Sequence, residues 1–290
     1  MRNEQAMMDL ILGKAKIDER IRAVIMNGSR TNPQAPIDCF QEFDIVYVVN
    51  DIHSFTSNHS WIDYFGKRIM MQLPDTSSLF SASNKDRFAY LMLFEDGNRL
   101  DLTLISMRSH NKLIKRESLS KILLDKDQII APFPSPNDRD YRVKKPSPKQ
   151  FLDCCNEFWW VSTYVAKGLW RKEVTYAKAM LEGPVRHMLM MMLKWHVGTT
   201  TNFTVSVGKS GKYLESYLDT SLWEKFMDTY PNGEYENIWN ALFLMGELFR
   251  TVALDVSSYL GYSYPNSDDA AVSSYLKHVY GLPPDATQIY

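Results

Sequence analysis

The stretch CFQEFDIVYVV, residues 39–49, decides the fold, because it places two carboxylates inside an apolar run with the composition of a β-strand. Side chains alternate between the two faces of a strand, so Glu42 and Asp44 share one face while Phe43 and Ile45 occupy the other. Two carboxylates about 7 Å apart on one strand face repel each other unless a cation lies between them. The stretch therefore predicts a strand with one buried face and a cation site on the other.

A third carboxylate, Asp101, lies in a similar run, RLDLTL at residues 99–104. If the two strands are neighbours, the three acids converge and offer the all-oxygen ligand set that Mg²⁺ prefers. Upstream, an apolar run ends in a Gly28–Ser29 turn. Glycine lets the backbone approach a ligand closely, Ser29 offers a hydroxyl and an N–H to phosphate oxygens, and Arg30 adds positive charge. The ordered set predicts a site for divalent metal ions and a triphosphate.

Apolar spacing predicts that the first half of the chain has an α+β fold. Helices are expected over residues 4–15 and 61–71, and strands over residues 21–26, 43–49, 88–94 and 99–105. The sequence EDGN separates the last two strands, and Asp-Gly between two β-rich runs is a strong hairpin signal. The regular alternation of a doubly wound fold is absent, so we expect a mixed or antiparallel sheet flanked by helices.

A proline-rich segment, APFPSPNDRDYRVKKPSPK at residues 131–149, predicts a boundary between two domains. Everything after it has the apolar spacing of helices, which we expect over residues 151–170, 175–196, 214–230 and 234–259. The predicted architecture is an α+β domain over residues 1–135 followed by an all-helical domain over residues 146–290.

Composition bounds the setting of the protein. The 290 residues, of which 45% are hydrophobic and 23% charged, suffice for two compact domains. The N-terminus lacks the pattern of a signal peptide and no run approaches 18 apolar residues, so we expect no membrane association. Three cysteines without metal-ligand spacing indicate free thiols in a reducing cytoplasm: Cys39, Cys154 and Cys155.

Charge is distributed unevenly along the chain. From residue 213 to 290, eleven Asp and Glu side chains face three Lys and Arg side chains, although the net charge of the whole chain is only -1. A net basic first part suits a polyphosphate, and an acidic last part suits a cationic partner. Ordinary solvated surface is the alternative interpretation of the same asymmetry.

The order of strand, Gly-Ser turn, acid–apolar–acid strand and later lone acid resembles the nucleotidyltransferase superfamily typified by DNA polymerase β. Six blocks between residues 21 and 173 further resemble the aminoglycoside 6-adenylyltransferases, also called streptomycin adenylyltransferases. These blocks are AVIMNGSR, DCFQEFDIVYVV, FGKRIMMQ, FEDGNRLDLTLI, LLDKD and CCNEFWWVSTYVAKGLWRKE. Stretches near residues 200–212 extend the likeness, which covers most of the chain.

The resemblance implies transfer of AMP from ATP to the 6-hydroxyl of streptomycin, with two Mg²⁺ ions and release of pyrophosphate. It implies that Glu42, Asp44 and Asp101 bind metal, that the first domain binds ATP, and that the helical domain binds the cationic aminoglycoside. The family usually has Asp-Tyr-Asp where this chain has Glu42-Phe43-Asp44. Glu42 is one methylene longer than Asp, and Mg²⁺ demands near-ideal octahedral geometry, so this departure bears on metal placement.

Two other functions remain open from the sequence. One is a nucleotidyltransferase with another acceptor, such as RNA or a protein. The acidic last part argues against nucleic acid, since binding nucleic acid requires a basic surface. The other is a non-catalytic nucleotide-binding module of the same fold, and the intact set of three acids argues against it. We expect a monomer rather than an oligomer.

A carboxylate of the helical domain is expected to take the proton of the attacking hydroxyl. Glu182, in the helix break AMLEGP, is the candidate catalytic base, with Glu157 and Glu173 as rivals and an exposed helix-end acid as the alternative. Other candidates are less specific. Lys209 and Lys212 are predicted to reach the pyrophosphate, and acceptor contacts are predicted for Trp159, Trp170 and Glu173, although tryptophans more often belong to the core.

Overall fold

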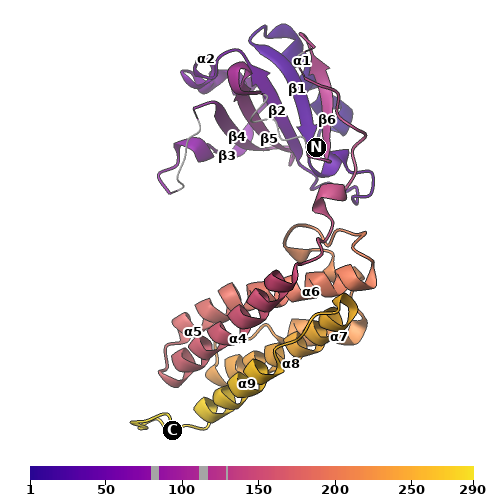
Figure 1. The fold of residues 1–290 in the computed structure, drawn as a ribbon. Coiled ribbons are helices and arrows are strands. Elements are labelled where there is room, and N and C mark those ends of the chain that lie inside the picture. Colours follow the sequence, from indigo (N-terminus) through magenta and orange to yellow (C-terminus); the bar gives the residue numbers. More distant parts are fainter. Residues whose placement is uncertain (80–84, 111–116, 129) are drawn as a thin grey trace. The chain divides into compact units, whose positions relative to one another are not determined.

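The structure, a computed structural model, describes residues 1–79, 85–110, 117–128 and 130–290. The chain divides into two compact units, Met1–Asp140 and Tyr141–Tyr290. All the strands belong to the first unit, whereas the second consists of helices and their connections (Figure 1). This arrangement confirms the α+β class with a separate helical part.

The N-terminal unit is built on a mixed six-stranded sheet with the order β3-β4-β5-β2-β1-β6. Its strands are β1 (Ile21–Asn27), β2 (Phe43–Val49), β3 (Arg68–Gln72), β4 (Arg87–Phe94), β5 (Arg99–Ser106) and β6 (Ser120–Asp125). Strands β2 and β5 pair in parallel, while the other neighbouring pairs of described strands are antiparallel. The β4–β5 hairpin was predicted from its Asp-Gly turn, whereas β6 was not predicted as a strand.

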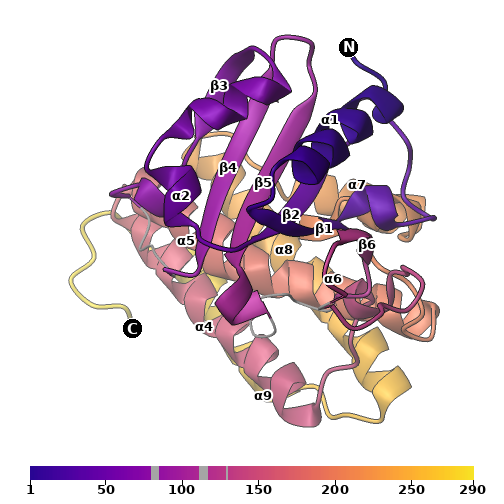
Figure 2. The same ribbon diagram turned by 90° about the horizontal axis from the view of Figure 1, so that it is seen from above.

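One face of the sheet is buried beneath helix α1 (Glu4–Ile17), which Figure 2 shows lying against the strands. The apolar residues of β2 that point to this face, among them Phe43, Ile45 and Tyr47, are fully or almost fully buried. The Tyr47 hydroxyl donates a 2.6 Å hydrogen bond to the Ile11 carbonyl, so the polar end of the buried ring is satisfied. Asp44, which alternates with these residues along β2, consequently points to the opposite face.

Residues 61–71 do not form the helix that was predicted for them. A 3₁₀ helix, His59–Phe65, ends at Gly66, whose φ of 115° lies in the left-handed region, and β3 begins two residues later. Most residues cannot continue a right-handed helix through such a backbone conformation. The apolar spacing is therefore shared by two short elements, the second of which forms the edge strand beside β4 (Figure 2).

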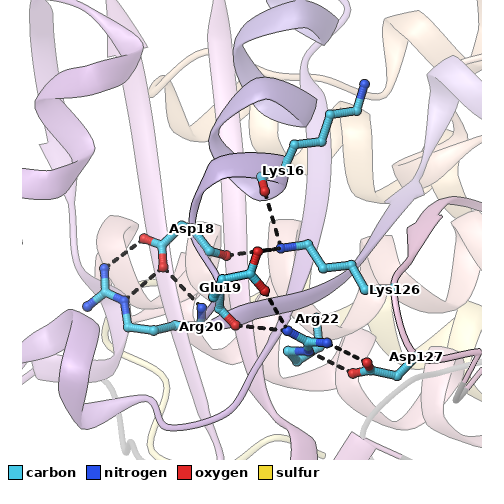
Figure 3. A network of polar contacts seen from close by, with 7 residues as sticks. All are labelled: Lys16, Asp18, Glu19, Arg20, Arg22, Lys126 and Asp127. Carbon is cyan, nitrogen blue, oxygen red and sulfur yellow. Dashed lines mark hydrogen bonds and ion pairs between the residues drawn. The ribbon is translucent and has the colours of Figure 1, made fainter.

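A polar network fixes the end of α1 to the two strands β1 and β6 (Figure 3). Asp18 accepts hydrogen bonds from Arg20 at 2.9 and 2.8 Å and forms an ion pair with Lys14 at 3.2 Å. Arg22 of β1 pairs with Asp127, just beyond β6, through two hydrogen bonds. The network lies where β1 begins, at the opposite end of that strand from Asn27, which pairs with Asp44.

The proline-rich segment belongs in part to the N-terminal unit. The Ser118 N–H donates a 2.8 Å hydrogen bond to the side chain of Asp140. The Ser118 carbonyl accepts a 2.8 Å hydrogen bond from the Asn137 N–H. Phe133 packs against the apolar residues on the second face of the sheet, Ile25, Val46 and Ile105. Residues 131–140, which lie in the segment that composition identified as the domain boundary, thus belong to the N-terminal unit.

The C-terminal unit contains helices α4 (Pro148–Trp170), α5 (Val174–Met180), α6 (Arg186–Thr200), α7 (Thr220–Asp228), α8 (Tyr235–Leu260) and α9 (Asn266–Tyr280). A capping box between Ser147 and Gln150 begins α4. Phe158 of α4 stacks on Phe249 of α8 with ring centroids 3.8 Å apart, at the centre of the helical core. Helix α9 was not predicted. Within the part of the chain that the structure describes, no helix has the length and apolarity to cross a bilayer.

Candidate active site

Three carboxylates meet at one end of strands β2 and β5. Glu42 immediately precedes β2, Asp44 is the second residue of β2, and Asp101 is the third residue of β5. The parallel register pairs Asp44 directly with Asp101, so both side chains project from the same face of the sheet. One carboxylate oxygen from each of the three residues lies within 4.8 Å of the others, and all three residues are half-buried.

The Gly28 turn closes over Asp44. Gly28 follows β1 directly and has a φ of 77°. A Cβ atom at residue 28 would lie 2.2 Å from Oδ2 of Asp44, so that oxygen fills the space that any other residue type would need. Ser29 then begins a one-turn 3₁₀ helix, Ser29–Thr31. The structure thereby brings the predicted phosphate-binding turn against the predicted metal ligands.

Arg99 is a member of this cluster that sequence reasoning missed. It precedes Asp101 by two residues in β5, and its guanidinium donates to both Asp101 oxygens, at 2.8 Å from Nε and 2.7 Å from Nη2. Its Nη1 lies 3.7 Å from Oε2 of Glu42. The hydrogen bonds that Arg99 donates to Asp101, with smaller contributions from the charges of Glu42 and Asp44, raise the pKa of Arg99 above its ordinary value. The i, i+2 rule that paired Glu42 with Asp44 also identifies Arg99 as a neighbour of Asp101.

Arg30 contacts the backbone that carries Glu42. Its guanidinium donates to the carbonyls of Gln41 at 2.8 Å and Glu42 at 3.2 Å, and pairs with Glu4 at 3.1 Å. The same group lies 3.8 Å above the ring of Phe43, and the side chain is 8% exposed. These contacts hold the segment before β2, and the phosphate contact predicted for Arg30 stays a prediction.

In the C-terminal unit, Glu182 lies in a π-helical turn, Leu181–Val185, between α5 and α6. Pro184 has no N–H for a helical hydrogen bond, which accounts for the break in the regular pattern. The Glu182 carboxylate is 32% exposed and pairs with Arg186 at 3.0 Å. Arg186 is itself buried and contacts Thr229 and the ring of Tyr230, so the position of the Glu182 carboxylate is fixed by a residue that cannot easily move.

The remaining candidates lie in different environments. Trp159 is 2% exposed and donates to the Tyr264 hydroxyl at 3.1 Å, so the prediction that it contacts the acceptor is corrected: it is a core residue. Trp170 is half-buried and donates to the Leu282 carbonyl. Glu173 is exposed at the start of α5. Exposed side chains are also found for the rival base Glu157 and for Lys209 and Lys212.

The carboxylate cluster has the chemistry and the spacing that Mg²⁺ requires. Ligand oxygens of one Mg²⁺ ion lie about 2.0–2.1 Å from the metal, so two of them are at most about 4.2 Å apart. A spread of 4.8 Å between the oxygens of the cluster needs only small side-chain rotations to meet that limit. All three donors are carboxylates, the ligand type that selects Mg²⁺ over softer metals. The residues present therefore fit the ion.

The chain is similar to known proteins along nearly its whole length. The family model described as streptomycin adenylyltransferase matches residues 1–279. An aminoglycoside 6-adenylyltransferase of Bacillus subtilis (strain 168) is 45% identical over 281 residues, covering 97% of this chain and 99% of that protein. One from Campylobacter jejuni is 42% identical over 288 residues, covering 98% and 99%. One from Staphylococcus aureus is 35% identical over 267 residues, covering 92% and 95%.

Among solved structures, the chain is similar to the crystal structure of an aminoglycoside 6-adenyltransferase from Bacillus subtilis. The identity is 41%, the TM-score is 0.49, and the match covers 97% of this chain and 100% of that one.

Proposed function

Because the chain belongs to the streptomycin adenylyltransferase family, we propose that it transfers AMP from ATP to the 6-hydroxyl of streptomycin and thereby inactivates the antibiotic. The observation that carries the proposal is the convergence of Glu42, Asp44 and Asp101 beside the Gly28 turn, in a chain that matches these enzymes end to end. A protein that only binds nucleotide has no need of three carboxylates at one point.

In the proposed reaction, the hydroxyl oxygen of the acceptor attacks the α-phosphorus of ATP. A new P–O bond forms, the bond from the α-phosphorus to the bridging oxygen breaks, and pyrophosphate leaves. Ser29 supplies its backbone N–H and its hydroxyl to the phosphate oxygens, and glycine at residue 28 allows the close approach that this requires. The three carboxylates would hold two Mg²⁺ ions. When bound, Mg²⁺ would neutralise phosphate charge and lower the pKa of the attacking hydroxyl.

The proton of the acceptor hydroxyl must pass to a base. We assign this role to Glu182, because the π-helical turn and the ion pair with Arg186 hold its carboxylate in one position while leaving it partly exposed. Within the proposal, Lys209 and Lys212 contact the departing pyrophosphate as exposed cations. Glu173 and Trp170 contribute to binding of the acceptor, which we assign to the C-terminal unit.

The acceptor's charge agrees with the composition of that unit. Residues 213–290 carry eleven acidic side chains against three basic ones, which favours a cationic aminoglycoside over an anionic acceptor such as RNA. Three free cysteines and the need for ATP support a cytoplasmic reaction. We propose that the active protein is a monomer.

The experiment that tests the proposal is incubation of the protein with ATP, Mg²⁺ and a panel of aminoglycosides, followed by mass spectrometry. Streptomycin is expected to gain the mass of one adenylyl group, which is AMP less one water, with release of one equivalent of pyrophosphate. Asp44→Asn is expected to abolish transfer while leaving the melting temperature close to that of the parent. Asp51→Asn, an exposed acid just beyond the far end of β2, serves as the matched control and should retain activity. Absence of AMP from streptomycin would refute the proposed acceptor.

A further inference from the structure

Arg99 holds the oxygen atoms that a metal ion would need. Both Asp101 oxygens accept hydrogen bonds from the guanidinium, at 2.8 and 2.7 Å, and Glu42 lies 3.7 Å from it. Such a bidentate pair directs the carboxylate lone pairs at the guanidinium. The guanidinium takes one lone pair of each oxygen, and its positive charge opposes a metal ion at the lone pairs that remain. Arg99 and a metal ion therefore compete for Asp101.

The Arg99 side chain can also move away from Asp101. Its side chain is 45% exposed, so moving it disrupts little packing. It lies opposite Leu93 in the β4–β5 pair, and Leu93 offers it no polar contact to replace Asp101. A guanidinium that leaves a carboxylate is stabilised if another anion is available, and phosphate groups accept bidentate hydrogen bonds from arginine. A nucleotide that arrives with its metal supplies such an anion, whereas a metal ion alone does not.

We propose that Arg99 is a displaceable counter-ion of the carboxylate cluster, which keeps metal ions off Asp101 and Glu42 until the nucleotide arrives. This inference rests on the proposed function, because it assumes that the same carboxylates receive metal. In the nucleotide-free protein Arg99 neutralises part of the cluster's charge and holds Asp101 in place. When metal and nucleotide bind together, the guanidinium exchanges Asp101 for a phosphate. Arg99 thus couples the binding of the metal to the binding of ATP.

The inference is tested by measuring Mn²⁺ binding in the absence of nucleotide, from the electron paramagnetic resonance signal of free Mn²⁺. Arg99→Gln removes the competing cation and is expected to tighten Mn²⁺ binding about tenfold, which corresponds to one charge-assisted pair. Arg99→Lys keeps the positive charge but cannot donate the bidentate pair of hydrogen bonds to Asp101, so we expect it to tighten Mn²⁺ binding less than Arg99→Gln does. With α,β-methylene-ATP present, the gain from Arg99→Gln should shrink, because the parent's Arg99 is then already displaced.

The control separates competition at Asp101 from a general change in charge. Arg68 lies on the edge strand β3 of the same sheet and forms an ion pair with Asp63. Arg68→Gln also removes one positive charge, and its Mn²⁺ affinity should stay within twofold of the parent's. Equal effects of Arg99→Gln and Arg68→Gln, or no effect of Arg99→Gln, would overturn the inference. If Arg99→Gln fails to fold, Arg99→Lys serves as the test. An Mn²⁺ affinity of Arg99→Lys equal to that of the parent would contradict competition between the bidentate guanidinium and the metal ion.

Failure of this inference is distinguishable from failure of the proposed function. Asp44→Asn is measured in the same titration. If Asp44→Asn weakens Mn²⁺ binding but Arg99→Gln does not strengthen it, the carboxylates bind metal and Arg99 is not a competitor. If neither variant changes Mn²⁺ binding, the cluster is not a metal site and the assignment of its three carboxylates is wrong.

Discussion

Gly28 and Asp44 are locked together: a Cβ atom at residue 28 would lie 2.2 Å from Oδ2 of Asp44, and Gly28 has a φ of 77°. No side chain fits there unless Asp44 moves. Since Asp44 is the central member of the carboxylate cluster, the turn and the cluster depend on each other.

Gly28→Ala is expected to reduce kcat/KM for AMP transfer by at least about 100-fold, because a displacement of about 1 Å at a reacting centre has effects of that size. The free energy of unfolding should also fall by about 1–2 kcal/mol, since alanine is strained at positive φ. Steady-state kinetics and chemical denaturation provide the two measurements.

Gly97→Ala is the matched control for this variant. Gly97 also has a positive φ, 85°, but nothing lies within 4 Å of a Cβ built there. The substitution should therefore lower stability by a similar amount and leave kcat/KM within about threefold. Equal losses of activity in the two variants would show that backbone strain, and not the contact with Asp44, is responsible.

Arg30→Ala distinguishes a clamp from a phosphate contact. Arg30 holds the carbonyls of Gln41 and Glu42 and stacks on Phe43, so its loss should loosen the segment that carries Glu42. We expect kcat to fall about tenfold or more, with KM for ATP changed less than threefold. A large rise in KM for ATP with kcat unchanged would instead restore the predicted role of Arg30 at the nucleotide.

The length of Glu42 is the chain's departure from its family's usual pattern. Glu42 precedes β2 and takes no part in the strand pairing, and Arg30 contacts only its carbonyl, so a shorter side chain at residue 42 can adjust. Glu42→Asp should therefore retain kcat within about tenfold of the parent. Glu42→Gln removes the charge and should cost at least about 100-fold. Kinetics at several Mg²⁺ concentrations measure both, and equal losses would mean that carboxylate position matters more than charge.

Glu182→Gln is expected to lower kcat about 100-fold with little change in either KM, as for loss of a general base. The same change leaves the buried Arg186 without its carboxylate partner, so stability should fall by about 1–3 kcal/mol. Thermal melting and kinetics at a temperature well below the transition separate the two effects. Glu157→Gln and Glu173→Gln are the controls. If either lowers kcat more than Glu182→Gln does, that residue and not Glu182 is the catalytic base.

Local rules predicted the parts of the site that lie close together in sequence. Alternation along one strand placed Glu42 and Asp44 on one face, and the same rule applied to β5 would have found Arg99 beside Asp101. The parallel pairing of β2 with β5 was only a hypothesis, because two strands and three short helical segments of the described chain separate them and no local signal specifies such a pairing.

Sequence rules do not distinguish between two uses of one residue type. An arginine at residue 30 is compatible with phosphate binding and with the hydrogen bonds that it donates to the Gln41 and Glu42 carbonyls, and its phosphate contact stays a prediction. Trp159 was a reasonable ring for a binding pocket, but its burial depends on Tyr264 and Phe249, which lie far along the chain. Apolar spacing over residues 61–71 concealed Gly66, whose positive φ ends the helical turn.

The network at the start of β1 gives the protein a defined response to acid. Hydrogen bonds from Arg20 lower the pKa of Asp18 from its ordinary value of 3.8 to about 2 (Figure 3). Because the folded-state pKa lies below the unfolded one, this carboxylate stabilises the fold above about pH 4, and the contribution disappears as the pH falls toward 2. Asp18→Asn should thus lower the free energy of unfolding by about 1–2 kcal/mol at pH 7, allowing for solvent screening.

The pH dependence distinguishes this charge effect from simple loss of packing. At pH 2.5 the parent has lost part of the same contribution, so its stability should approach that of Asp18→Asn, whereas a packing defect would keep the difference constant with pH. Urea denaturation at pH 7, 4 and 2.5 measures the convergence. Adenylyl transfer by Asp18→Asn should remain within twofold of the parent at 25 °C. Asp18 lies just before the start of β1, whereas Asn27, which pairs with Asp44, is the last residue of that strand. If Asp18→Asn lost activity without losing stability, the polar network at the start of β1 would not be independent of the carboxylate cluster.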